Sequence, residues 1–213
     1  MVIAGSVYGV VLNDGAERAA LASAFDAAPY QRPPVAPVMY IKPRGCIAPH
    51  GSTVVLADDA ATVEVAATIG LLFRHDASRV AASRALDTIG AACLALDLSV
   101  PHDSYYRPPV RHRARDGFLP LGTFGPFDEA LFEREIVTFV DEREAHRWLC
   151  TRLVASAADL IAEISAFMTL RAGDLLLIGL PGDAPRIGAG VQVRAELNGL
   201  PSVEARFVAE AVA

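Results

Sequence analysis

Short segments of alternating apolar and polar residues recur along this chain, with the period of two that half-buried strands show. Apolar residues at helical spacing are confined to fewer segments. The alternating pattern and the turn residues between segments predict strands over residues 7–12, 38–43, 52–57, 62–73, 133–140, 145–149, 174–179, 191–197 and 203–208. Helices are expected over residues 16–25, 78–87 and 153–168, with Gly173 ending the last. The chain is therefore predicted to be a β-rich α+β domain with few helices.

Three segments carry further expectations. Residues 89–98 form an apolar run whose period does not distinguish a strand from a helix. Residues 102–127, rich in proline, arginine and aromatic residues, are expected to form a long loop of the kind that often covers a binding site. Asn198-Gly199 predicts a type I′ turn between the last two strands.

Composition narrows the class of protein. The chain has 213 residues, of which 53% are hydrophobic and 21% charged, so intrinsic disorder is excluded. Its richest apolar stretch, residues 63–73, is shorter than a membrane span and contains Glu64. The first residues lack the basic flank of a signal peptide, so we expect a cytoplasmic protein. The sequence shows no internal repeat and no domain boundary, so we expect a single domain over residues 1–213.

Net charge and the number and spacing of cysteines exclude further classes of protein. The net charge of −6 argues against a nucleic-acid partner that is held through phosphate contacts. The three cysteines, Cys46, Cys93 and Cys150, are far apart and form no metal-binding pair, so they are expected to be buried thiols. No nucleophile-elbow, zinc-protease or phosphate-loop motif is present, and the glycine-rich residues 179–190 fit no nucleotide-binding pattern.

Two acidic residues interrupt apolar strands. Glu64 and Asp97 each lie in a hydrophobic run, where a carboxylate is costly to bury unless it is paired, hydrogen-bonded or bound to a metal. Carboxylate oxygens are the ligands that Mg²⁺ prefers. The alternative is that each side chain faces solvent on its strand.

The segment after His102 concentrates groups that recognise anions. Tyr105, Arg107, Arg111 and Arg113 together suit a small anionic substrate, because arginine binds carboxylates through two parallel hydrogen bonds. His102 is a candidate acid–base group. The alternative is that these arginines are solvated and paired with acidic neighbours such as Asp103 and Asp116.

Five segments, taken in order along the chain, resemble the fumarylacetoacetate hydrolase family. They are Tyr40-Ile-Lys-Pro43, residues 64–70, Asp97-Leu-Ser99, Arg115-Asp-Gly-Phe-Leu-Pro-Leu-Gly122 and residues 173–181. Within the family, residues 98–108 most resemble the bifunctional isomerase/decarboxylases of 4-hydroxyphenylacetate (homoprotocatechuate) degradation, in their first half or first subunit. The resemblance implies a mixed β-sheet roll.

It also implies a Mg²⁺ or Mn²⁺ site built from a Glu-x-Glu pair and an aspartate, with Glu64 and Asp97 at two of the three positions. The substrates implied are 5-oxopent-3-ene-1,2,5-tricarboxylate and 2-hydroxyhepta-2,4-diene-1,7-dioate. Arg113 and His102 are the expected catalytic residues, and Tyr105, Arg107 and Arg111 the expected substrate-binding residues. The implied partner is a second copy or a homologous subunit.

The chain departs from the family pattern at the expected site. Thr62 replaces the first glutamate, Arg113 replaces a lysine, and Ile178 and Leu180 replace two threonines. The histidine and glutamate of the family's catalytic lid do not follow Asn13.

Two hypotheses follow from these departures. The chain is either a self-sufficient Mg²⁺-dependent lyase/isomerase, with Thr62 or water completing the metal shell, or a weak or silent subunit whose homologous partner holds the intact site. We favour the second. A carbon–carbon hydrolase fits less well, because the lid histidine that would activate water is missing.

Overall fold

A mixed sheet of eight strands forms the larger layer of the protein. The computed structural model describes residues 3–102 and 104–211. The strand order is β2 (Val38–Lys42), β1 (Val7–Val11), β10 (Leu175–Leu177), β5 (Val63–Phe73), β6 (Ile89–Ser99), β7 (Leu119–Leu121) and β3 (Ile47–Pro49), with β11 (Arg186–Ile187) pairing with β5. The β1–β10 and β3–β7 pairs are parallel and the others antiparallel.

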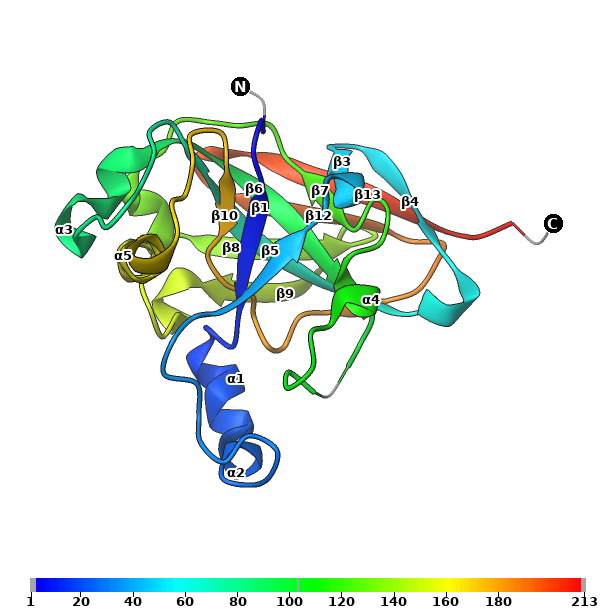
Figure 1. Ribbon diagram of the computed structural model, residues 1–213. Helices are drawn as coiled ribbons and strands as arrows, with labels where there is room; N and C mark the ends of the chain where they lie inside the picture. Colours follow the sequence, from blue (N-terminus) through cyan, green and yellow to red (C-terminus); the bar gives the residue numbers. More distant parts are fainter. Residues whose placement is uncertain (1–2, 103, 212–213) are drawn as a thin grey trace.

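A second sheet of five strands packs against the first (Figure 1). Its order is β4 (Ser52–Leu56), β13 (Leu200–Ala209), β12 (Gln192–Leu197), β8 (Glu135–Val140) and β9 (Arg143–Leu149). The main apolar core draws residues from both sheets. Trp148 on β9 also donates a hydrogen bond from Nε1 to the Ala67 carbonyl on β5, at 2.9 Å, which ties the two sheets together.

Helices are short and lie at the edges of the sheets. They are α1 (Gly15–Ala20), α2 (Ala22–Phe25), α3 (Ala82–Ala85), α4 (Val110–Arg113) and α5 (Ala157–Phe167), with 3₁₀ turns η1 (Arg44–Cys46), η2 (Asp58–Ala60), η3 (Leu86–Thr88), η4 (Glu129–Glu133) and η5 (Cys150–Arg152). Within the described residues, we find no helix with the length and apolarity needed to cross a membrane. Figure 1 shows α1 and α2 projecting at one end of the sheets. Helix α1 contacts the loop that precedes α4, through the hydrogen bond from the Tyr105 hydroxyl to Glu17.

The predicted β-rich α+β architecture is confirmed, and so are the buried thiols at Cys46, Cys93 and Cys150. The ambiguous run from residue 89 is a strand, β6, because both of its faces are covered and apolar residues therefore occupy successive positions. The expected long loop at 102–127 is interrupted by α4 and β7.

Three local predictions were wrong. The last helix ends at Phe167, six residues before Gly173, because Met168 is extended and Leu170 pairs with the backbone of Ala77. The helix expected over residues 78–87 is α over only four residues, Ala82–Ala85, and continues as the 3₁₀ turn η3. The positive φ pair of a type I′ turn falls on Asp141 and Glu142, at 46° and 64°, and not on Asn198-Gly199.

Candidate active site

A buried carboxylate surrounded by cations lies at the centre of the site. Asp97 projects from β6 and is 1% exposed. Its Oδ2 accepts a hydrogen bond from the Tyr40 hydroxyl at 2.5 Å, and its Oδ1 lies 3.1 Å from Lys42 Nζ and 3.2 Å from Arg113 Nη1. Burial lowers the pKa of Lys42, an effect that the Asp97 charge opposes. Burial raises the pKa of Tyr40, and the neighbouring Asp97 charge raises it further. The negative charge of Asp97 is therefore balanced by the side chains of Lys42 and Arg113.

The second acidic candidate, Glu64, is also paired with a cation. Arg186 stands directly opposite Glu64 in the β5–β11 pairing, so the two side chains share one face of the sheet. Arg186 donates from Nε and Nη2 to Glu64 Oε1, at 3.0 and 2.8 Å. The Glu64 side chain is 27% exposed and that of Arg186 64%, so this pair lies at the rim of the site.

A third carboxylate approaches from the opposite side. Glu17 projects from α1, and its Oε1 accepts a hydrogen bond from the Tyr105 hydroxyl at 2.7 Å. Burial raises the pKa of Glu17, while the hydrogen bond from Tyr105 and the charge of Arg113 partly offset that rise. Burial likewise raises the pKa of Tyr105, reinforced by the Glu17 charge.

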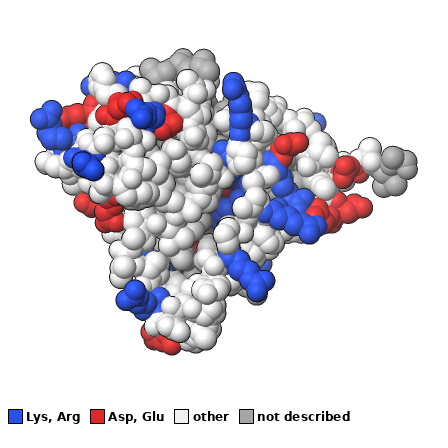
Figure 2. Space-filling model, viewed as in Figure 1, with Lys and Arg blue, Asp and Glu red and all other residues white. Residues whose placement is uncertain are grey.

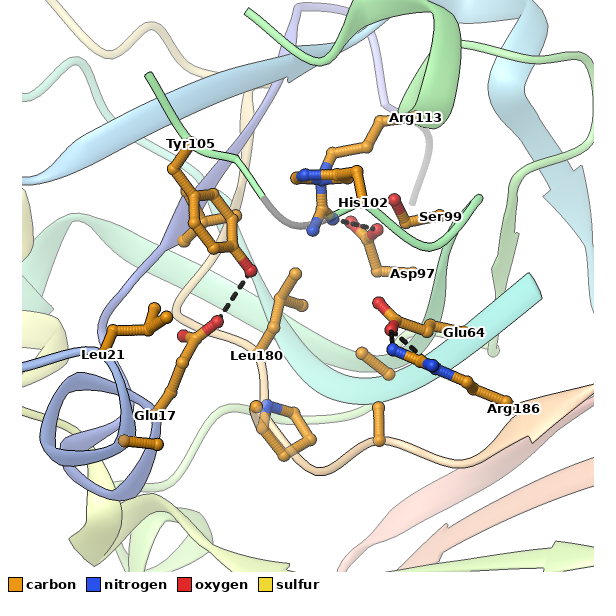
Figure 3. A pocket seen from close by; sticks show the side chains of 16 residues that line it. Glu17, Leu21, Glu64, Asp97, Ser99, His102, Tyr105, Arg113, Leu180 and Arg186 are labelled. Carbon is orange, nitrogen blue, oxygen red and sulfur yellow. Dashed lines mark hydrogen bonds and ion pairs between the residues drawn. The ribbon is translucent and has the colours of Figure 1, made fainter. Parts of the chain in front are cut away.

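The three carboxylates, together with Tyr105, Arg113 and Arg186, line one cavity of about 260 Å³ (Figure 3). Leu180, one of the two predicted apolar replacements, forms part of its wall, whereas Ile178 is buried in the main core. His102 lies over Arg113 in the view of Figure 3. Burial and the charge of Arg113 lower the pKa of His102, which favours a neutral imidazole.

The structure brings most of the predicted site residues together. Glu64, Asp97, His102, Tyr105 and Arg113 all line the cavity. Their expected roles stay predictions.

The two other predicted residues lie elsewhere. The described lining residues include neither Arg107 nor Arg111, which are both exposed. Arg111 donates to Asp59 at 2.9 Å, and Arg115 does so as well, so one part of this arginine segment is paired on the surface. Asp103, the other acidic partner considered above, lies outside the described residues. Figure 2 shows acidic and basic side chains interspersed on this face of the molecule, with no large region of one sign.

The arrangement does not fit a divalent metal ion. A carboxylate coordinates Mg²⁺ or Mn²⁺ through its oxygen lone pairs, but Lys42 and Arg113 already contact Oδ1 of Asp97. The Tyr40 hydroxyl donates to Oδ2 of Asp97, and Arg186 donates to Oε1 of Glu64. Thr62, at the position of the missing glutamate, is exposed and is not among the described lining residues. Across residues 3–102 and 104–211, no three His, Cys, Asp or Glu side chains come together as a metal site.

Sequence reasoning missed two charged residues of the cavity, Glu17 and Arg186. Glu17 lies in a helix predicted only from the helix-prone composition of residues 16–25, and nothing local marks it as functional. Arg186 belongs to a two-residue strand within the glycine-rich segment, and only its pairing with Glu64 reveals its place. The register of such a short strand carries no sequence signal.

The C-terminal model of fumarylacetoacetate (FAA) hydrolase matches residues 6–208 of the chain. The chain belongs to the fumarylacetoacetate hydrolase family. Among curated relatives, a 4-hydroxyphenylacetate degradation bifunctional isomerase/decarboxylase of Salmonella dublin is 36% identical over 206 residues, which are 97% of this chain and 48% of that protein. A second 4-hydroxyphenylacetate degradation bifunctional isomerase/decarboxylase, from Escherichia coli, is 32% identical over 206 residues, again 97% of this chain and 48% of that protein. This fumarylacetoacetate hydrolase family chain thus spans about half the length of these relatives.

Solved structures of the family share the fold. A 5-carboxymethyl-2-hydroxymuconate delta-isomerase from Mycobacterium smegmatis aligns with a TM-score of 0.82 and 24% identity, covering 99% of this chain and 81% of that one. Fumarylpyruvate hydrolase from Pseudomonas aeruginosa, solved with Mn²⁺ and pyruvate, aligns with a TM-score of 0.80 and 21% identity, covering 97% and 90%. At these identities the likeness concerns the fold alone.

Proposed function

We propose that this chain is one half of a two-part isomerase/decarboxylase of 4-hydroxyphenylacetate degradation. Its substrates are 5-oxopent-3-ene-1,2,5-tricarboxylate and 2-hydroxyhepta-2,4-diene-1,7-dioate. In this proposal the chain is weak in the metal-dependent decarboxylation, which takes place on a homologous partner subunit. The relatives named above support the pathway, since both are bifunctional isomerase/decarboxylases of 4-hydroxyphenylacetate degradation.

The pairing of Glu64 and Asp97 with arginine and lysine carries the proposal. A metal ion that bound Oδ1 of Asp97 and Oε1 of Glu64 would have to compete with the buried cations Lys42 and Arg113 and with Arg186. Breaking a buried ion pair by removing one partner typically costs about 3–5 kcal/mol. Mg²⁺ gives up its water reluctantly and relies on few charged ligands, so the competition favours the internal cations.

Two observations support a partner subunit. The curated relatives are about twice as long as the aligned segment, which leaves room for a second half. Beside the cavity, Ile41, Tyr106 and Val110 are 59%, 61% and 65% exposed, a surface suited to contact with a homologous subunit. The proposal takes residues 1–213 as one domain and includes the expected cytoplasmic location.

Calorimetric titration of the purified chain with Mn²⁺ tests the proposal directly. We expect no saturable binding and no decarboxylation of the tricarboxylate by the chain alone. A T62E/R186A double variant should gain Mn²⁺ binding, because it frees Glu64 and adds a second carboxylate two residues earlier, in the bend that leads into β5. T62Q/R186A is the matched control, since it frees Glu64 without adding the second charge, and it should bind at least about tenfold more weakly, or roughly 1.4 kcal/mol.

Tight Mn²⁺ binding by the unmodified chain, together with turnover, would contradict the proposal. That result would support the alternative function, a self-sufficient Mg²⁺-dependent hydrolase or 2-oxo-acid decarboxylase of the same family.

A further inference from the structure

The carboxylate of Glu17 is fixed in place over the cavity. Asp14 caps α1 by accepting from the Ala16 amide at 3.1 Å, and it also accepts from the Gly182 amide at 2.9 Å and from Arg152. A Cβ atom on Gly182 would lie 2.5 Å from the Cβ of Glu17, so the absence of a side chain there lets α1 seat closely on the loop. The start of α1, which carries Glu17, is therefore held by several tertiary contacts.

Within the described residues, Tyr105 is the hydrogen-bond partner of the Glu17 carboxylate, which it contacts through Oε1. The second oxygen, Oε2, remains available to accept a proton. The charged groups whose fields act on Glu17 are Asp14, Arg113 and Glu64. Burial dominates their sum and makes the ionised carboxylate a stronger base than a solvated one.

Arg113 supplies a cation with spare donors in the same cavity. Its side chain is 6% exposed, and Nη1 donates to Asp97 at 3.2 Å. Its Nε is buried and has no hydrogen-bond partner among the described residues. Because Arg113 lines the cavity, its positive charge is suited to stabilise an oxyanion that forms there.

We propose that Glu17 is the proton-transfer group of this cavity, with Tyr105 as the residue that positions its carboxylate, and that the cavity enolises a 2-oxo dicarboxylate without a metal ion. This inference rests on the proposed function for its substrate class, and it assigns to the chain the isomerisation chemistry rather than the decarboxylation.

The step is balanced without an oxidant, a reductant or a cofactor. The Glu17 carboxylate takes a proton from the carbon next to the ketone. The C–H electron pair becomes the new carbon–carbon double bond, and the carbonyl π pair moves onto oxygen, where Arg113 stabilises the charge. Glu17 then returns the proton to the same carbon or, in a conjugated dienolate, to a carbon farther along the chain. The net change is an isomerisation.

Deuterium exchange measures this step directly. The chain is incubated in D₂O with EDTA and either 2-oxoglutarate or 2-oxoadipate, and the loss of the C3 proton signal is followed by NMR. We expect the wild-type chain to accelerate exchange over buffer and E17Q to slow it by at least about a hundredfold, the lower end of what a positioned acid–base group contributes. E133Q, which removes an exposed carboxylate on η4, is the matched control and should exchange like the wild type.

The Y105F variant separates a chemical role from a structural one. Its missing hydroxyl removes a hydrogen bond that lowers the pKa of Glu17, so the pH midpoint of exchange should move upward. An unmoved midpoint, equal rates in wild type and E17Q, or no exchange by the wild type would overturn the inference. None of these results would alter the Mn²⁺ titration, so failure of the inference is distinguishable from failure of the proposed function.

Discussion

At the scale of single residues, Lys42 has the most complete set of partners in the site. Its ammonium donates to the carbonyls of Leu98, Arg113 and Phe118, at 2.8, 2.9 and 3.0 Å, in addition to pairing with Asp97. The side chain is fully buried. Buried charges persist only when paired and hydrogen-bonded, and Lys42 meets both conditions.

Replacing Lys42 with methionine should therefore destabilise the protein. The variant removes one hydrogen-bond donor from each of three carbonyls and one of the two cations from Asp97, so we expect a loss of about 3–5 kcal/mol in the free energy of unfolding, measured by urea titration. R84M is the control, because it removes a cation that is 77% exposed and paired with Asp87 on the surface, where the expected change is below about 1 kcal/mol. Similar stabilities for the two variants would contradict this account of Lys42.

The identities of the site residues were predictable from sequence only where a residue lay in an unusual local context. Glu64 and Asp97 interrupt apolar strands, and Tyr105 and Arg113 belong to a segment of distinctive composition, so pattern alone singled them out. Glu17 and Arg186 have no such context. Contacts between distant segments place them, as when Glu17 meets Tyr105 across 88 positions of the chain.

At the scale of elements, α1 depends on one buried aspartate. Asp14 is fully buried and links the start of α1 to Arg152 near β9 and to the backbone at Gly182. A helix of six residues has little stability of its own, so these tertiary contacts hold it in place.

An Asp14→Ala variant should loosen α1 more than the rest of the protein. We expect a loss of roughly 1–2 kcal/mol, as for a helix cap that also has side-chain partners. Hydrogen exchange of the amides in residues 16–21 should become faster. Asp128→Ala removes an exposed cap of the same geometry on η4 and should leave those amides unchanged. Equal protection of α1 in both variants would show that Asp14 does not anchor it.

The long strands were the most predictable elements, because β5 and β6 each combine continuous apolar sequence with flanking turn residues. The short elements were the least predictable. β11 and α4 contain two and four residues, too few to show a period, and their formation depends on pairing or packing with distant segments.

At the scale of the whole molecule, the two sheets share one apolar core, with Trp148 between them. Trp148 is the only tryptophan of the chain and is 2% exposed. Its fluorescence therefore reports on the contact between the sheets, whereas far-UV circular dichroism reports on the strands of both.

If the chain is one cooperative domain, the two signals should give the same midpoint in urea. We expect emission from a buried indole in the native state and a single shared transition towards the spectrum of exposed tryptophan. A fluorescence midpoint clearly below that of circular dichroism would indicate that the sheets separate first and would contradict a single domain.

Lys42 is also the only lysine in the sequence, so arginine supplies all other side-chain positive charge apart from histidine. Because its ammonium is enclosed by β2, β6 and the segment before β7, reagents that acylate lysine have no accessible side-chain target in the native state. Covalent labelling of Lys42 requires the core around Asp97 to open. The extent of Lys42 acylation therefore measures how often this part of the core opens, at the residue whose charge balances the carboxylate at the centre of the site.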